Sequence, residues 1–119
     1  MYRILQVEDL PSDAYLVRRE VIKVLGPCEF QITEDGDNFV QSLVDFMPDL
    51  IISDFNVPGF DVFTALNLTK KNAPGTPFIV VTGSTSEELR TECLKAGAID
   101  LICKSEIEKL GPMIINALK

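Results

Sequence analysis

Residues 50–56 read LIISDFN, an apolar run that ends abruptly in polar residues. A strand in the middle of a parallel sheet is covered by helices on both faces, so its sequence is apolar throughout instead of alternating. Residues 78–81, which read FIVV, have the same character. We therefore predict that residues 50–53 and 78–81 form two central strands of a parallel sheet.

Three further apolar runs lie at residues 4–7, 30–33 and 99–103, and apolar residues at helical spacing follow each of the five runs. The run at 30–33 alternates and the run at 99–103 contains a charge, so we place these two at the sheet edges. With right-handed crossovers the pattern predicts an α/β fold. The expected architecture is (βα)5, a doubly wound five-stranded parallel sheet with strand order 2-1-3-4-5 and helices on both faces.

Signals for helix starts accompany this pattern. Asp61 is expected to cap the third helix. Ser84 with Glu87, and Ser105 with Glu108, have the spacing of a capping box and predict the starts of the fourth and fifth helices.

Length and composition restrict the class of protein. A chain of 119 residues, 46% hydrophobic, has the size of one compact domain, so we expect a single domain over residues 1–119. A formal net charge of -7 without a run of Lys and Arg argues against a nucleic-acid partner. No segment approaches the ~20 apolar residues of a membrane span or has a signal-peptide core, so we predict no membrane association and a cytoplasmic location.

The sequence contains no histidine, which excludes Ser-His-Asp and Cys-His nucleophile chemistry and His-containing zinc sites. Cys28, Cys93 and Cys103 are an odd number of cysteines without a C-x-x-C motif, as expected in a reducing compartment. Any chemistry here therefore uses carboxylates, hydroxyls, lysine or thiols.

Polar residues follow four of the five predicted strands. Glu8 and Asp9 follow the first strand, Asp54 the third, Thr82 the fourth and Lys104 the fifth. The carboxyl ends of parallel strands meet at one edge of a sheet, beside the point where strand order reverses. Two carboxylates at ~4 Å repel by about 4 kcal/mol at an effective dielectric near 20, so three of them need a compensating cation. An all-oxygen site suits Mg²⁺, or Mn²⁺.

With these motifs the chain resembles the receiver domain of two-component response regulators, a flavodoxin-like fold, over essentially its whole length. The matching segments are residues 4–9 (ILQVED), 48–59 (PDLIISDFNVPG), 80–83 (VVTG) and 95–98 (KAGA), followed by Lys104.

The resemblance implies that Asp54 accepts a phosphoryl group from the phosphohistidine of a histidine kinase or histidine phosphotransfer domain. Thr82 and Lys104 would bind the phosphoryl oxygens. The implied Mg²⁺ ligands are Glu8, Asp9, Asp54 and the backbone carbonyl of Asn56. Phosphorylation would then switch the surface formed by the fourth helix, the fifth strand and the fifth helix, which is expected to bind an output protein of unknown identity or a second copy of the chain.

The sequence departs from the family pattern at two positions. Leu101 stands where the family usually has Tyr or Phe, so an aromatic switch in its usual form is not expected. Ser105 follows Lys104 where the family commonly has a cis proline, and we expect a trans peptide because a non-proline cis bond costs about 3 kcal/mol. Asn56 and Ser84, beside the site, carry no acid or base and predict neither strong acceleration nor strong protection of phosphoryl hydrolysis.

Other functions fit the same fold. A receiver-like interaction module that is never phosphorylated is favoured mildly by Leu101 and Ser105, although the complete set of acidic, hydroxyl and lysine residues argues against it. A flavodoxin-like electron carrier needs a phosphate-binding loop after the first strand, and the acidic residues 8–13 would repel a phosphate. A hydrolase of the aspartyl-phosphate kind usually has a second carboxylate where this chain has Asn56.

Overall fold

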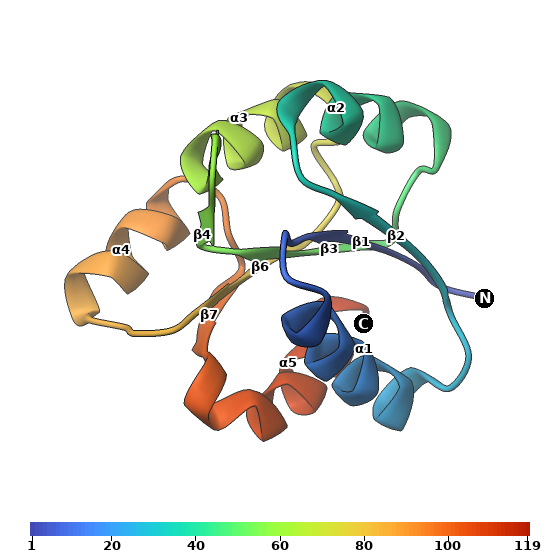
Figure 1. Ribbon diagram of the computed structural model, residues 1–119, viewed down its shortest axis with the longest axis vertical. Coiled ribbons are helices and arrows are strands. Elements are labelled where there is room, and N and C mark those ends of the chain that lie inside the picture. The colour runs from blue at the N-terminus through green and yellow to red at the C-terminus, as the bar shows by residue number, and fades with distance from the viewer.

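The apolar runs of the sequence form the five strands of one parallel sheet in the computed structural model, which describes residues 1–119 (Figure 1). The strands are β1 (Arg3–Val7), β2 (Glu29–Thr33), β3 (Leu50–Asp54), β6 (Phe78–Thr82) and β7 (Asp100–Cys103). All four neighbouring pairs are parallel. The order β2-β1-β3-β6-β7 confirms the predicted order 2-1-3-4-5 and the predicted edge strands.

Helices connect the strands, and one short hairpin follows β3. The α-helices are α1 (Pro11–Leu25), α2 (Gly36–Asp45), α3 (Val62–Asn72), α4 (Glu87–Lys95) and α5 (Leu110–Ala117). A 3₁₀ helix, η1 (Lys104–Lys109), precedes α5. The strands β4 (Asn56–Val57) and β5 (Phe60–Asp61) form an antiparallel hairpin that the sequence patterns did not predict. None of the helices combines the length and apolar character needed to cross a bilayer.

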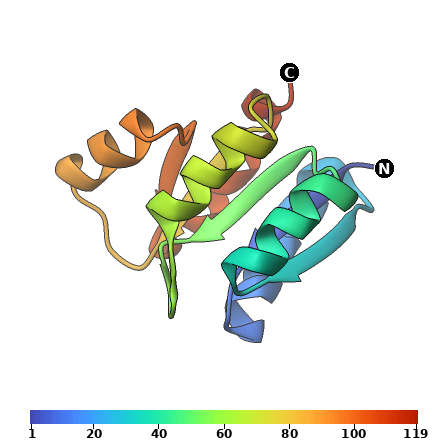
Figure 2. The same ribbon diagram turned by 90° about the horizontal axis from the view of Figure 1, so that it is seen from above.

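The sheet lies between two helical layers, with α1 and α5 on one face and α2, α3 and α4 on the other (Figure 1). Seen from above, α2 and α3 lie side by side across the sheet (Figure 2). Along β3, Ile51 packs into the core beneath α2 and α3, while Leu50 and Ile52 pack against α1 and α5. Both faces of the central strands are buried, which explains why their sequences do not alternate.

The helix-start predictions were right for α3 and wrong for the fourth and fifth helices. Asp61 caps α3 by accepting a hydrogen bond from a backbone N–H of its first turn. The cap of α4 is Ser86 and not Ser84, which lies in the preceding loop with its carbonyl held by a threonine hydroxyl. Ser105 lies inside η1, where its hydroxyl donates to the sulfur of Cys103 at the end of β7 and caps no helix, and α5 begins only at Leu110.

Candidate functional site

The ends of four strands bring the predicted site residues to one edge of the sheet. Glu8 and Asp9 directly follow β1, Asp54 is the last residue of β3, Thr82 is the last of β6 and Lys104 directly follows β7. β1 and β3 are neighbours in the sheet, yet their chains continue to opposite sides of it. Such a reversal of strand order leaves a crevice at the carboxyl ends of the strands, where ligands bind in this class of fold.

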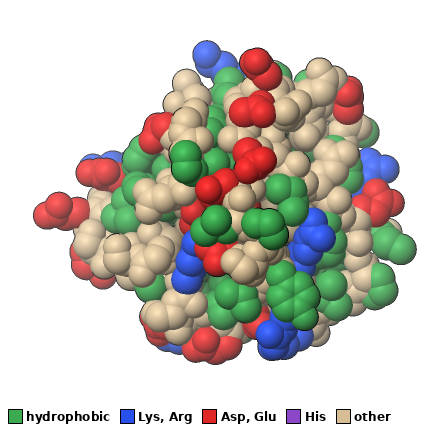
Figure 3. All heavy atoms as spheres, viewed as in Figure 1, with side chains coloured by type: hydrophobic (Ala, Val, Ile, Leu, Met, Phe, Trp, Pro, Cys, Tyr) green, Lys and Arg blue, Asp and Glu red, His purple; other side chains and the backbone are tan.

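Three of these side chains form a compact carboxylate cluster. One carboxylate oxygen from each of Glu8, Asp9 and Asp54 lies within 4.8 Å of the other two. Glu8 and Asp54 are only 6% and 8% exposed, and Asp9 is half-buried. In a space-filling view, acidic side chains gather at the centre of this face with apolar side chains beside them (Figure 3). The prediction that these carboxylates converge is confirmed.

The charge on this cluster is only partly compensated within the protein. Burial, and next the charge of Asp54, raise the pKa of Glu8 from 4.5 to about 7. The backbone N–H groups of Asp9 and Leu10 donate to Glu8 Oε2 at 3.1 and 3.3 Å, and Lys104 adds a positive charge, but together they offset only part of the increase. A buried, oxygen-only donor set with excess negative charge fits a hard divalent cation such as Mg²⁺.

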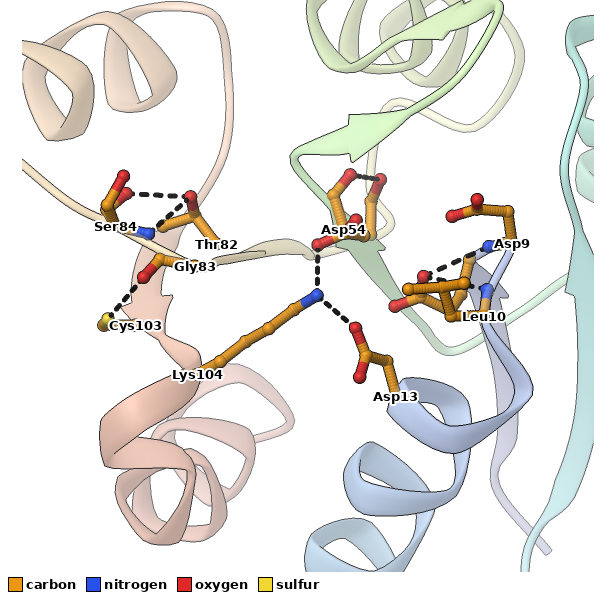
Figure 4. Close-up of polar contacts among 11 residues, drawn as sticks. Asp9, Leu10, Asp13, Asp54, Thr82, Gly83, Ser84, Cys103 and Lys104 are labelled. Carbon is orange, nitrogen blue, oxygen red and sulfur yellow. Dashed lines mark hydrogen bonds and ion pairs between the residues drawn. The ribbon is translucent and has the colours of Figure 1, made fainter.

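Lys104 crosses the site from η1 and contacts two carboxylates. Its Nζ lies 3.0 Å from Asp54 Oδ1 and 2.5 Å from Asp13 Oδ2 (Figure 4). Burial by itself would lower the pKa of Lys104, but the hydrogen bonds to Asp13 and Asp54 outweigh it and raise the pKa to about 12. The ammonium therefore stays charged at any physiological pH.

Asp13 was missed as a site residue by the sequence interpretation. Pro11 is the first residue of α1, which puts Asp13 in the first turn of the helix. Side chains of a helix tilt toward its N-terminus, and the N-terminus of α1 lies at the carboxyl end of β1. Pro11, as a marker of the helix start, could therefore have indicated that the Asp13 carboxylate lies near the site. The pairing of Asp13 with Lys104 depends on side-chain conformation and could not have been predicted.

Thr82 is not joined to the carboxylates by a hydrogen bond. Thr82 is only 2% exposed. Its hydroxyl donates to the backbone carbonyl of Ser84 at 2.8 Å and accepts from the Ser84 N–H at 3.4 Å. The hydroxyl is directed to the loop between β6 and α4 (Figure 4). A hydroxyl has one proton, so Thr82 must release the Ser84 carbonyl before it can donate a hydrogen bond to a group bound at Asp54.

The remaining predicted positions lie around this centre. Asn56, two residues beyond Asp54, opens the β4 hairpin strand with an exposed side chain. Leu101, in β7, is fully buried and belongs to the core beneath α2, α3 and α4. The peptide between Lys104 and Ser105 is trans, as predicted.

Comparisons with known proteins match this geometry to one family. The family model described as the response regulator receiver domain matches residues 4–114. The chain is 32% identical over 100 residues to a protein-glutamate methylesterase/protein-glutamine glutaminase of Archaeoglobus fulgidus, covering 80% of this chain and 28% of that protein. It is 31% identical over 114 residues to the luminescence regulatory protein LuxO of Vibrio campbellii, covering 95% of this chain and 25% of that one. The chain thus spans about a quarter of the length of the curated relatives it matches.

Solved structures show the same arrangement. The receiver domain of NtrX from Brucella abortus superimposes with a TM-score of 0.84 at 26% identity, covering 97% of both chains. The response regulator domain of Thermotoga maritima CheB superimposes with a TM-score of 0.79 at 24% identity, covering 99% of this chain and 93% of that one. The latter likeness concerns the fold alone.

Proposed function

The chain belongs to the response regulator receiver domain family, and on this basis we propose that it is a phosphoacceptor receiver of a two-component phosphorelay. Its acceptor is Asp54, and the receiver is a single domain over residues 1–119. The observation that carries the proposal is the near-complete burial of Asp54 between two other carboxylates and a lysine ammonium. Receiver domains of this family typically act as signalling switches and do not themselves turn over a separate substrate.

In the proposed reaction a carboxylate oxygen of Asp54 attacks the phosphorus of a phosphohistidine on a partner kinase or phosphotransfer domain. The new O–P bond forms as the P–N bond breaks, and the imidazole nitrogen leaves with the electron pair and takes a proton from water. The product is an aspartyl phosphate. Its formation is an example of nucleophilic attack by a carboxylate. A partner must supply the histidine, because this chain has none.

The donor set suits Mg²⁺, and Mn²⁺ would fit the same oxygens. The ligands we assign are Glu8, Asp9, Asp54 and the backbone carbonyl of Asn56. When bound, the cation supplies positive charge that offsets the repulsion between the carboxylates and an incoming phosphoryl group. The raised pKa of Glu8, caused first by burial and next by the charge of Asp54, supports this assignment, because a bound cation would favour the ionised carboxylate against both effects.

Lys104 and Thr82 are assigned to the phosphoryl oxygens. Lys104 already reaches Asp54, so its ammonium can pair with a phosphoryl oxygen there as a point charge. Thr82 would exchange the Ser84 carbonyl for a second phosphoryl oxygen and draw the β6–α4 loop inward. One to three charge-assisted hydrogen bonds are enough to bias two states of a loop.

The surface formed by α4, β7 and α5 is the proposed output surface and a candidate homodimer contact. Arg90 on α4 pairs with Asp100 of β7, and its Nη2 donates to the carbonyl of Leu101 at 2.9 Å. These contacts support a coupled movement of α4 and β7 when the preceding loop moves. They offer a route to the output that needs no aromatic residue at position 101.

A phosphorylation-independent interaction module is the alternative, and two observations favour it. The Thr82 hydroxyl is satisfied within its own loop, and Leu101 is fully buried where the family usually has an aromatic switch. Both are compatible with a domain that stays in one state.

Intact-mass spectrometry separates the two functions. With Mg²⁺ and acetyl phosphate as donor, the wild-type chain is expected to gain the mass of one phosphoryl group and to gain none when a chelator removes the metal. A folded protein that gains no mass and does not bind beryllium fluoride, a phosphoryl mimic, would favour the phosphorylation-independent module.

A further inference from the structure

A single lysine ammonium is shared by two carboxylates that come from different elements of the fold. Lys104 Nζ lies 3.0 Å from Asp54 on β3 and 2.5 Å from Asp13 on α1 (Figure 4). The side chains are sheltered, with exposures of 28% for Lys104, 22% for Asp13 and 6% for Asp54. Contacts between sheltered charges are screened less by salt than surface ion pairs are, so both are expected to persist in solution.

Asp13 is held in a fixed place relative to the sheet. It lies in the first turn of α1, two residues after Pro11, and the helix is anchored in the core by the buried Val17 and Val21. Lys104, in contrast, has a flexible side chain whose ammonium offers three donors and no preferred direction. The fixed carboxylate therefore decides where the mobile ammonium rests.

Without Asp13, Asp54 would be the one carboxylate left in direct contact with Lys104, and the ammonium would close onto it. A lysine that closes fully onto Asp54 competes with a cation for that carboxylate. Such a lysine also reduces the negative charge on the Asp54 oxygen that has to attack phosphorus. Asp13 takes one donor away and holds the ammonium between α1 and β3, so that Lys104 stays at the site while Asp54 stays accessible.

We propose that Asp13 is a positioning residue of the phosphoacceptor site, which acts through Lys104 to keep Asp54 available to the metal and the phosphoryl group. The proposal rests on the proposed function for its phosphoryl part, but the metal part stands on the carboxylate cluster alone. In the phosphorylated state Lys104 keeps its bond to Asp13 and turns its other donors to the phosphoryl oxygens. No large movement of the side chain is required.

A double-mutant cycle tests whether Asp13 acts through Lys104. Asp13→Asn keeps the size of the side chain and removes its charge, and it is made both in the wild-type chain and in Lys104→Met. The Mg²⁺ dissociation constant, measured by calorimetry with the metal alone, is expected to rise about tenfold on Asp13→Asn in the wild-type chain, the loss of roughly one charge-assisted contact. In the Lys104→Met chain the same substitution is expected to change it less than about twofold.

Glu34→Gln is the matched charge control. Glu34 is exposed and lines the same surface hollow as Glu8 and Asp9, but it makes no contact with Lys104. Its removal is expected to weaken Mg²⁺ binding less than about threefold, because exposed charges are screened. Asp13→Glu, which keeps a carboxylate on a longer side chain, is expected to recover part of the affinity lost in Asp13→Asn.

The outcomes are distinct. An equal effect of Asp13→Asn with and without Lys104, an effect no larger than that of Glu34→Gln, or no effect at all would overturn the positioning role.

The rate of phosphoryl gain from acetyl phosphate at saturating Mg²⁺ is the second measurement, and Asp13→Asn is expected to lower it about tenfold. If the wild-type chain binds Mg²⁺ with the expected coupling but gains no phosphoryl group, the proposed function fails and the metal part of the positioning role stands. Failure of the wild-type chain to bind Mg²⁺ overturns both.

Discussion

Asp54→Asn is expected to abolish the Mg²⁺-dependent gain of a phosphoryl group from acetyl phosphate while leaving the chain folded. An amide carries no negative charge and is a poor nucleophile toward phosphorus, and it is also a weaker ligand for a hard divalent cation. The side chain is nearly buried and the substitution preserves its size, so packing should change little. Intact-mass spectrometry after incubation with the donor measures the gain, and circular dichroism confirms the fold.

Asp45→Asn is the matched control for this substitution. Asp45 is an exposed residue at the C-terminal end of α2, and the same change of Asp to Asn there removes one charge from the chain without touching the site. Its phosphoryl gain should equal that of the wild-type chain. A phosphoryl group retained by Asp54→Asn would mean that another carboxylate is the acceptor, and the assignment of Asp54 would then be wrong.

The fold could be predicted from the sequence because its central strands are buried on both faces. Residues 50–52 and 78–81 are apolar without interruption, and in the structure β3 and β6 are fully covered by the two helical layers. The edge strands could be recognised by their polar residues for the same reason. The β4–β5 hairpin and η1 could not be predicted, because elements of two to six residues depend on the local packing of a connecting loop more than on periodicity.

The convergence of the carboxylates followed from topology, whereas the pairing of individual side chains did not. Parallel strands that end in register must bring Glu8, Asp54 and Lys104 to one edge, whatever their rotamers. Whether Lys104 bonds to Asp13, or Thr82 to Ser84, depends on side-chain rotations that cost about 1 kcal/mol or less and leave no pattern in the sequence. Because these rotations cost so little, phosphorylation of Asp54 could change these side-chain contacts without changing the fold.

Glu8→Gln is expected to raise the free energy of unfolding of the metal-free chain by about 3 kcal/mol above pH 7. The pKa of Glu8 is 4.5 in the reference state and about 7 in the folded protein, where burial and Asp54 oppose its ionisation. Between these two values the folded chain binds more protons than the unfolded chain, so the stability of the wild-type protein falls as pH rises. Above pH 7 the full free-energy cost of ionising Glu8 in the folded protein is present. A difference of 2.5 pKa units (7 − 4.5) corresponds to a cost of about 3 kcal/mol.

Urea denaturation with a chelator at pH 4.5 and pH 8 measures this cost. The advantage of Glu8→Gln over the wild-type chain should be small at pH 4.5, where Glu8 is protonated in the folded protein, and should approach its full size at pH 8. Glu34→Gln, which removes an exposed carboxylate, should shift stability by no more than about 0.5 kcal/mol at either pH.

Mg²⁺ should stabilise the wild-type chain more than Glu8→Gln, because the metal binds the ionised carboxylate and relieves the repulsion that the amide removes permanently. Equal stabilities of the two chains at pH 8 without metal would show that the charge of Glu8 is already compensated, and the carboxylate cluster would then lose its main argument as a cation site.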